Sequence, residues 1–346
     1  MQHILSYYPS ELEELMLSLG EPKYRAQQIF SQLHKGILLS EMTNVGKKTK
    51  EKLADVVDTT LPVVKKKLVS QIDGTVKYLF ELSDKNCIES VVMKYEHGYT
   101  ICVSSQVGCR MGCKFCASTL GGRVRNLEAG EILGQVLAAN RDLNIRISNI
   151  VMMGIGEPLD NFDNSVRFLK LVNHEQGVNI GYRHISLSTC GVVTGIYKLA
   201  ELDMPITLSI SLHAPDDKTR SEIMPVNNSW GVAELLCACR DYYKKTGRRI
   251  SFEYTLISGK NDSKQLAEKL AQVLNSALRT RDESMPIHVN LIPVNEVDET
   301  CFKPADKKRV QQFASTLESR GIRATVRRKL GSDINASCGQ LRREDS

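Results

Sequence analysis

The chain lacks any apolar run that could cross a membrane, since no stretch of its 346 residues approaches the ~20 apolar residues that a spanning helix needs. Its N-terminus, MQHILSYYPSELEELM, has no basic start, apolar core or small-residue cleavage site like those of a signal peptide. Its content of 42% hydrophobic and 25% charged residues is that of a globular protein. We therefore expect a protein without membrane contact that stays in the cytoplasm.

The ten cysteines show neither a disulfide framework nor a closed zinc site. Several are clustered and others are isolated among apolar residues, which fits reduced thiols in a chain of this length. A structural zinc site needs four ligands and usually shows a second C-x2-C or H-x3-H pair, which is missing here. Cys237 and Cys239 are spaced C-x-C in a helix-like stretch, where their side chains point apart.

Three cysteines stand together in the string CRMGCKFC. Cys109, Cys113 and Cys116 form a C-x3-C-x2-C triad, with Phe115 directly before the last cysteine. Three thiolates can hold three irons of a cubane [4Fe-4S] cluster and leave the fourth iron open to a ligand. Chance would produce this spacing in roughly one chain in a hundred with as many cysteines, so chance explains it poorly. The triad indicates an open iron-sulfur cluster, with zinc as the alternative.

Positive charge gathers at the two ends of the chain. Residues 303–346 carry 11 Lys and Arg against 5 Asp and Glu, an excess as large as the +6 of the whole chain. Such patches suit a polyanionic partner such as RNA, although solvated helix faces would give the same pattern. The basic residues in the N-terminal part are Lys47, Lys48, Lys50, Lys52, Lys65, Lys66 and Lys67.

Hydrophobic periodicity divides the chain into four parts. Helical spacing predicts short helices over 1–62, and a period near two predicts a β-rich hairpin region over 63–99. Strand-like and helix-like segments alternate over 100–330, which predicts an α/β fold whose parallel sheet is closed or partly closed into a barrel. Residues 331–346 form a C-terminal tail. The candidate strands of the barrel are TICVSS, NIVMMG, HISLST, ITLSISL, ISFEYTLI, HVNLIPV and RATVRR.

Polar residues follow several of these strands, at the ends where α/β barrels build their active sites. In MMGIGEPLDN, Gly156 lets the backbone approach a ligand closely, and Glu157 can accept a hydrogen bond from a cationic amino group. Each such residue alone is more often a turn or cap, but together they would surround one pocket. Further residues of this kind are Ser188, Ser211, His213 and Asn295.

Several strings occur in the order of one known family. They are CVSSQVGCRMGCKFC, GRVRNLEAGEI, VMMGIGEPLDN, SISLHAP, MPVN and CGQL, and they span about residues 87–341. The chain resembles the RlmN/Cfr family of radical S-adenosylmethionine (SAM) RNA adenosine methyltransferases. The resemblance implies a partial (β/α) TIM-like barrel and, at 1–62, a helical RNA-binding accessory domain. It also implies a [4Fe-4S] cluster on the triad, two SAM molecules per turnover, and SAM contacts from Gly156, Glu157, Ser188, Ser211, Leu212, His213 and Asn295.

The same resemblance implies a mechanism. One SAM methylates Cys338, and a second SAM at the cluster yields a 5′-deoxyadenosyl radical that takes a hydrogen from the S-methyl group. The carbon radical then adds to adenine, Glu89 accepts the adenine proton, and Cys102 attacks Cys338 to release the product through a transient disulfide. From the residues alone, Glu89 would be an exposed strand residue and Cys338 a small buried one.

The implied substrates are 23S rRNA, at an adenosine of the peptidyl-transferase centre, and tRNA, at the adenosine 3′ of the anticodon. The string FCASTLGGRVRNL favours the RlmN branch, which methylates adenine carbon 2, over the Cfr branch, which methylates carbon 8, confers antibiotic resistance and more often has FCATG. An electron donor such as flavodoxin or ferredoxin and a monomeric enzyme are expected. A non-catalytic iron-sulfur RNA-binding protein and a radical SAM enzyme of small molecules are the alternatives.

Some residues near the implied site depart from the family pattern. Asn335 and Ser337 precede Cys338 where the family more often has an acidic residue and alanine, and Cys190 stands where serine is common. The cysteines that match no required position are interpreted as core or surface residues, and they are Cys87, Cys190, Cys237, Cys239 and Cys301.

Overall fold

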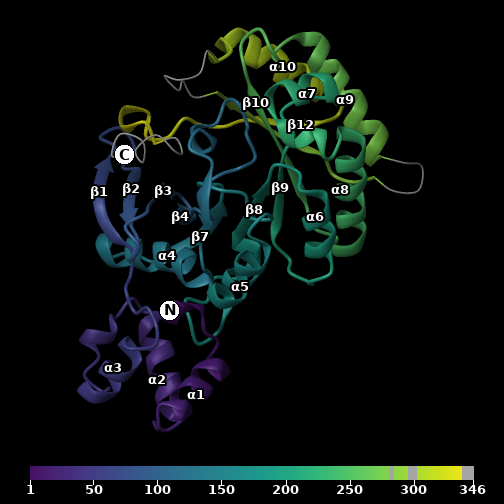
Figure 1. Ribbon diagram of the computed structural model, residues 1–346. Coiled ribbons are helices and arrows are strands. Elements are labelled where there is room, and N and C mark those ends of the chain that lie inside the picture. Colours follow the sequence, from purple (N-terminus) through teal and green to yellow (C-terminus); the bar gives the residue numbers. More distant parts are fainter. Residues whose placement is uncertain (280–283, 295–301, 337–346) are drawn as a thin grey trace.

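The computed structural model describes residues 1–279, 284–294 and 302–336, and it is built on one long mixed sheet (Figure 1). Within these residues the sheet has ten strands in the order β1-β2-β3-β4-β7-β8-β9-β10-β11-β12. Strand β4 pairs antiparallel with β3 and parallel with β7, and every later pair is parallel. Because β1 and β12 are the two edges, the barrel is partial, as the family resemblance implies. The strands are β1 (Val63–Val69), β2 (Val76–Glu81), β3 (Cys87–Tyr95), β4 (Gly98–Cys102), β7 (Ile147–Met152), β8 (Ile185–Thr189), β9 (Thr207–Ser211), β10 (Ile250–Leu256), β11 (His288–Pro293) and β12 (Arg323–Val326).

Helices alternate with the parallel strands, which confirms the predicted α/β fold class. The sequence of β10, ISFEYTL, is rich in β-branched and aromatic residues, and all its positions are buried, as in a strand covered on both faces. Among the described residues, no helix is both long and apolar enough to cross a membrane. The helices of the barrel are α4 (Ala129–Leu143), α5 (Phe162–Asn173), α6 (Val193–Ala200), α7 (Asp217–Ile223), α8 (Val232–Thr246), α9 (Lys264–Leu278) and α10 (Lys307–Ser319).

The N-terminal helices form a lobe at one end of the molecule, below α4 and α5 in Figure 1. The lobe is joined to the barrel at the start of α4, where the backbone N–H of His3 donates to Glu128 Oε2 at 2.8 Å and that of Gly130 donates to Ser6 Oγ at 2.8 Å. These bonds satisfy backbone groups that a helix start leaves without partners. The elements of the lobe are η1 (Ile4–Ser6), α1 (Pro9–Ser18), α2 (Tyr24–Leu33), η2 (Leu39–Glu41) and α3 (Lys47–Ala54).

The antiparallel strands set the position of two predicted catalytic residues. Val91 of β3 lies opposite Cys102 of β4 and also opposite Lys77 of β2. Since side chains alternate between the faces of a sheet, Glu89, two residues from Val91, shares a face with Cys102 and Lys77. The register therefore gathers these three side chains on one side of the sheet.

Candidate active site

The loop with the three cysteines is carried by a small antiparallel pair, β5 (Gln106–Gly108) and β6 (Arg123–Asn126). Gly108 has a φ of +77°, and a Cβ there would lie 1.9 Å from the carbonyl oxygen of Gly122. Only glycine suits both conditions. The N–H of Cys109 donates to the same oxygen at 3.0 Å, so the contact of these two backbones fixes where the loop begins.

The thiols of this loop are free and influence one another. Cys109 and Cys113 are buried, and Cys116 is partly buried. The pKa of Cys109 is raised to about 12, mainly by burial and in part by the charge of Cys116. Burial also raises the pKa of Cys113, and both other thiols add to the effect. The three sulfurs therefore lie within electrostatic reach, and they hold protons that a metal can replace.

This donor set fits a cluster better than a single ion. In the described part of the chain, no three His, Cys, Asp or Glu side chains are grouped closely enough to hold one metal ion. In a cubane each thiolate binds its own iron, so the ligands stand further apart than around one zinc ion. The number and type of these ligands, three free thiols of one loop within electrostatic reach of one another, fit a [4Fe-4S] cluster.

The turn after β7 lies directly against the strand that enters the cysteine loop. The N–H of Gly154 donates to the carbonyl of Val103 at 3.0 Å, and a Cβ on Gly154 would come within 2.6 Å of that oxygen. Gly156 has a φ of +109°, and a Cβ there would lie 2.8 Å from the backbone nitrogen of Gln106 in β5. Because Gly154 and Gly156 have no side chains, the GIGEP turn can lie beside the loop with the three cysteines, which we call the cluster loop.

Glu157 joins this turn to the end of the next strand. Its Oε2 accepts from the N–H of Cys190 at 2.7 Å, and its Oε1 accepts from the N–H of Leu159 at 3.0 Å. The side chain is buried, and burial raises its pKa although these hydrogen bonds lower it. A carboxylate has lone pairs for further donors, so Glu157 can hold the turn and still accept from an amino group.

Two residues make contacts at this site that the sequence interpretation missed. Cys190 is a core residue, as interpreted, but its thiol also bonds to Glu157 and lies within electrostatic reach of Cys113. Arg220 is fully buried, and it donates to the carbonyl of Cys190 at 2.6 Å and to that of Leu212 at 3.0 Å. It therefore clamps the ends of β8 and β9 together. Nothing in the sequence signals this, because arginine is usually exposed.

His213 supports the cluster loop through its ring. It has a φ of +57°, and its Nδ1 accepts from the N–H of Thr255 at 2.9 Å. Burial lowers its pKa to about 3, so the ring is neutral and carries its proton on Nε2. The ring meets that of Phe115 edge to face, with centroids 5.0 Å apart. His213 thus contacts the aromatic residue that precedes Cys116.

The two predicted serines lie on a polar face of the sheet. Ser188 and Ser211 are partly buried, and the register places Ser188 beside Ser209 and Ser211 beside Glu253. Glu253 is buried and accepts from Asn290 Nδ2 at 2.7 Å. The alternate positions of β8 and β9 are apolar and belong to the core, so the opposite face offers polar partners to a cofactor.

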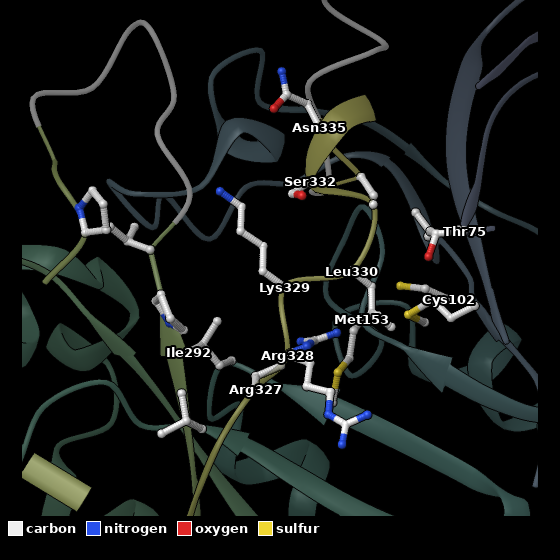
Figure 2. Close-up of a pocket in the computed structure, with 18 of the residues that line it drawn as sticks. Thr75, Cys102, Met153, Ile292, Arg327, Arg328, Lys329, Leu330, Ser332 and Asn335 are labelled. Carbon is white, nitrogen blue, oxygen red and sulfur yellow. The ribbon is translucent and has the colours of Figure 1, made fainter. Parts of the chain in front are cut away.

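A cavity of about 830 Å³ opens where β4, β7, β11 and β12 end, and both Glu89 and Cys102 line it. Figure 2 shows the strap 327–330 crossing this pocket between Cys102 on one side and Ile292 on the other. Burial raises the pKa of Cys102 to about 11, while the charge of Arg327 lowers it and that of Glu89 raises it. Charge on either side of the cavity therefore acts on this thiol.

Glu89 is buried rather than exposed, so its interpretation from sequence alone as an exposed strand residue was wrong. Its Oε2 lies 3.2 Å from the Nζ of Lys77, which is fully buried on the neighbouring strand. A buried carboxylate needs such compensation, because leaving water costs several kcal/mol per ion. Glu89 also lies within electrostatic reach of Cys116, which links the cavity to the cluster loop.

Two predicted site residues, Cys338 and Asn295, lie outside the described residues, as do Ser337 and Cys301. The segment before Cys338 is described as far as Ala336, which lines the same cavity as Glu89 and Cys102. The structure thus brings two predicted catalytic residues and the approach to the third to one cavity.

Comparisons with known proteins show which families the chain resembles. The radical SAM superfamily matches residues 103–270, and the N-terminal domain of ribosomal RNA large subunit methyltransferase matches residues 2–58. A protein of Clostridium novyi (strain NT) named as a probable dual-specificity RNA methyltransferase RlmN is 52% identical over 345 residues, which are 99% of this chain and 98% of that protein. A protein of the same name from Alkaliphilus oremlandii (strain OhILAs) is 52% identical over 99% of this chain and 97% of its own length.

A solved structure of a radical SAM methyltransferase from Sphaerobacter thermophilus has the same architecture. It superposes with a TM-score of 0.91 at 40% sequence identity, and the match covers 98% of this chain and 99% of that one. The similarity therefore includes the N-terminal lobe, the antiparallel strands and the partial barrel. With its three-cysteine loop and its full-length relatives, the chain belongs to the RlmN family of radical SAM methyltransferases.

Proposed function

We propose that this enzyme methylates carbon 2 of an adenosine in the peptidyl-transferase centre of 23S rRNA and of the adenosine 3′ of the anticodon in tRNAs. The observation that carries the proposal is the shared cavity of Glu89, Cys102 and the segment before Cys338. A base, a resolving thiol and a methyl-carrying thiol are the groups that this reaction needs. The names of the relatives, which call them dual-specificity RNA methyltransferases, support the same substrates.

The carbon to be methylated explains the cofactors. Carbon 2 of adenine is an electron-poor amidine carbon, so it does not attack a sulfonium methyl group as an amine does. A [4Fe-4S] cluster and SAM, when bound, supply a 5′-deoxyadenosyl radical and hence a one-electron route. Cys109, Cys113 and Cys116 would hold the cluster, and the turn of Gly156 and Glu157 beside them would hold SAM.

Glu89 would act as the base, and its position suits that role. It is buried, faces the cavity and has its charge compensated by Lys77. Addition of the methylene radical on Cys338 to the adenine ring would leave one unpaired electron. The adduct would give this electron to a one-electron acceptor, such as an iron-sulfur centre, and Glu89 would accept the proton from carbon 2 at a carboxylate oxygen. The burial of Glu89 limits competition from water for this proton.

Cys102 would then release the product. Its thiolate attacks the sulfur of Cys338, so that an S–S bond forms while the S–CH2 bond breaks. The electron pair of the broken bond passes to the carbon, which takes a proton and becomes the methyl group of the RNA. A cellular dithiol supplies the two electrons and two protons that return the disulfide to thiols.

The mouth of the cavity suits an RNA strand. Arg327, Arg328 and Lys329 are exposed and follow one another along the strap that crosses it. Consecutive cations bind phosphates without regard to sequence and can hold the backbone beside an extruded base. We assign the phosphates next to the target nucleotide to this strap, and RNA binding at more distant sites to the N-terminal lobe, where Lys47 and Lys48 are exposed.

RNA substrates of this kind place the enzyme in the cytoplasm, and we propose that it works as a monomer. A low-potential donor of the flavodoxin or ferredoxin type would supply its electrons. The electron donor and the monomeric state both rest on the proposed reaction. The radical route begins with one electron, and it needs no second protein chain in the cavity.

The test is anaerobic reconstitution followed by assay with both RNAs. We expect 2-methyladenosine in nuclease digests of each RNA, measured by mass spectrometry, and no product from Cys338→Ala although its iron and visible absorbance are unchanged. Formation of 8-methyladenosine would show the Cfr reaction instead. Full methylation by Cys338→Ala would exclude the proposed carrier, and binding without any methylation would favour a non-catalytic protein.

A further inference from the structure

The chain before Cys338 is fastened to the turn between β1 and β2. Asp333 accepts from Ser70 Oγ at 2.6 Å and from the backbone N–H of Gln71 at 2.8 Å. In the opposite direction, Asp73 accepts from the N–H of Gly331 at 2.8 Å. The C-terminal segment and the β1–β2 turn thus each supply one carboxylate to the other. Hydrogen bonds to charged groups are stronger than those between neutral groups. Figure 1 shows this C-terminal segment beside the ends of β1 and β2.

Lys77 extends this contact into the cavity. Its Nζ donates to the backbone carbonyl of Asn335 at 3.0 Å and lies 3.2 Å from Glu89 Oε2. One ammonium group therefore contacts both the proposed base and the chain three residues before Cys338. Asn335 has a φ of +44°, a left-handed conformation that asparagine tolerates better than most residues. The chain therefore bends at Asn335, whose carbonyl accepts the hydrogen bond from Lys77.

Stability alone does not account for a buried lysine here. Replacing a buried ion pair by well-packed apolar residues is often neutral or stabilising. The ammonium has three donors, which lets it hold two partners from different parts of the chain at once. An apolar side chain at this place could hold neither.

We propose that Lys77 is a positioning residue that holds the chain before Cys338 against Glu89, so that the methyl carrier and the base reach the same adenine. The inference rests on the proposed function and deepens it. Lys77 does not touch the adenine; it acts through Asn335 and Glu89, whose relative position it sets.

The cleanest comparison is between Glu89→Gln and the double variant Glu89→Gln/Lys77→Met. Both lack the base, and the double variant leaves no uncompensated carboxylate, so they differ only in the ammonium group. Amide hydrogen exchange of residues 331–336, measured by mass spectrometry on protein without RNA, reports how firmly the segment is held. Loss of a hydrogen bond from a charged donor should speed exchange about tenfold to a hundredfold. Lys94→Met, on the exposed part of β3, is the matched control and should leave exchange unchanged.

A second readout is S-methylation of Cys338, measured from the intact mass of the protein. Glu89→Gln should still carry the methyl group, because the base is not needed for that step, whereas the double variant should carry several-fold less. Equal exchange at 331–336 in the two variants would overturn the proposal. If methionine prevents folding, Lys77→Gln in the same background gives the same comparison, since its amide is too short to reach Asn335.

The outcomes keep this inference apart from the proposed function. If Cys338→Ala methylates RNA normally, the proposed reaction fails whatever the exchange rates are. If Cys338→Ala is inactive but exchange is the same with and without Lys77, only the positioning role fails. Lys77→Arg, which keeps a charged donor, should restore slow exchange and most of the S-methylation.

Discussion

Substitution of Gly108 by alanine should prevent the cysteine loop from forming correctly. Its φ of +77° already costs an L-residue about 1–2 kcal/mol. A Cβ would also lie 1.9 Å from the carbonyl oxygen of Gly122, so one backbone must move. Movement breaks the hydrogen bond from Cys109 to that oxygen, worth a further ~0.5–1.5 kcal/mol. We expect Gly108→Ala to lose about 1.5–3.5 kcal/mol of folding free energy and to bind much less iron.

The same loop supplies two graded controls. Gly121 has open space around its Cβ position and no left-handed backbone, so Gly121→Ala should be neutral or slightly stabilising, by about 0.4–1 kcal/mol. Gly122 has a φ of +65° but equally open space, so Gly122→Ala should show the backbone cost of about 1–2 kcal/mol without the clash. The order of the three variants in stability therefore separates the cost of the left-handed backbone from the cost of the clash with Gly122.

Two measurements test this series. Denaturant unfolding of the cluster-free proteins gives the free-energy differences, and iron per chain after anaerobic reconstitution reports whether the three thiols are in place. The reasoning predicts that iron falls in the order Gly121→Ala, Gly122→Ala, Gly108→Ala. If Gly108→Ala binds as much iron as Gly121→Ala, the close approach of Gly108 and Gly122 does not shape the loop.

Two further predictions concern the cavity. Because the pKa of Cys102 is raised to about 11, mainly by burial, its alkylation by iodoacetamide should rise nearly tenfold per pH unit from pH 7 to 9. Glu89→Gln removes the nearby negative charge, so it should lower the pKa of Cys102 and speed its alkylation at every pH. Peptide mass mapping measures the alkylation, and slower alkylation in this variant would contradict the influence of Glu89 on Cys102. In the strap, Arg328→Gln should weaken RNA binding and reduce the slope of log affinity against log salt by about one. Arg146→Gln, an exposed residue distant from the strap in sequence, is its control, and equal slopes would remove Arg328 from the RNA interface.

The parts of the molecule that were predictable depend on local patterns. Alternating strands and helices predicted an α/β fold with a parallel sheet, closed or partly closed, because periodicity and turn residues are properties of neighbouring positions. The resemblance to the family specified the partial barrel. The cysteine spacing predicted a cluster because three ligands of one loop are close in sequence. Family motifs then placed Glu89 and Cys102, which the register of β3 and β4 brings to one face.

The residues that were missed act through contacts between distant segments. Arg220 clamps the ends of β8 and β9, and Lys77 reaches Asn335 across 258 positions of the chain. Both side chains are fully buried. A sequence gives no reason to expect this, because arginine and lysine are usually exposed. Cys190 was interpreted correctly as a core residue. Its thiol also makes a hydrogen bond to Glu157, which could not be foreseen because Glu157 lies in the turn after a different strand, β7.

The charges around the cavity suggest an order for the last steps of the reaction. Burial raises the pKa of Cys102 and keeps the thiol protonated, and the charge of ionised Glu89 adds to this rise. If Glu89 takes the adenine proton as proposed, it becomes neutral and no longer raises the pKa of Cys102, while the charge of Arg327 still lowers it. Cys102 would therefore become a better nucleophile only after the proton has left carbon 2. Such coupling would protect S-methylated Cys338 from premature attack. It requires the proposed base and the proposed resolving thiol to line one cavity, and Glu89 and Cys102 both line the cavity described above.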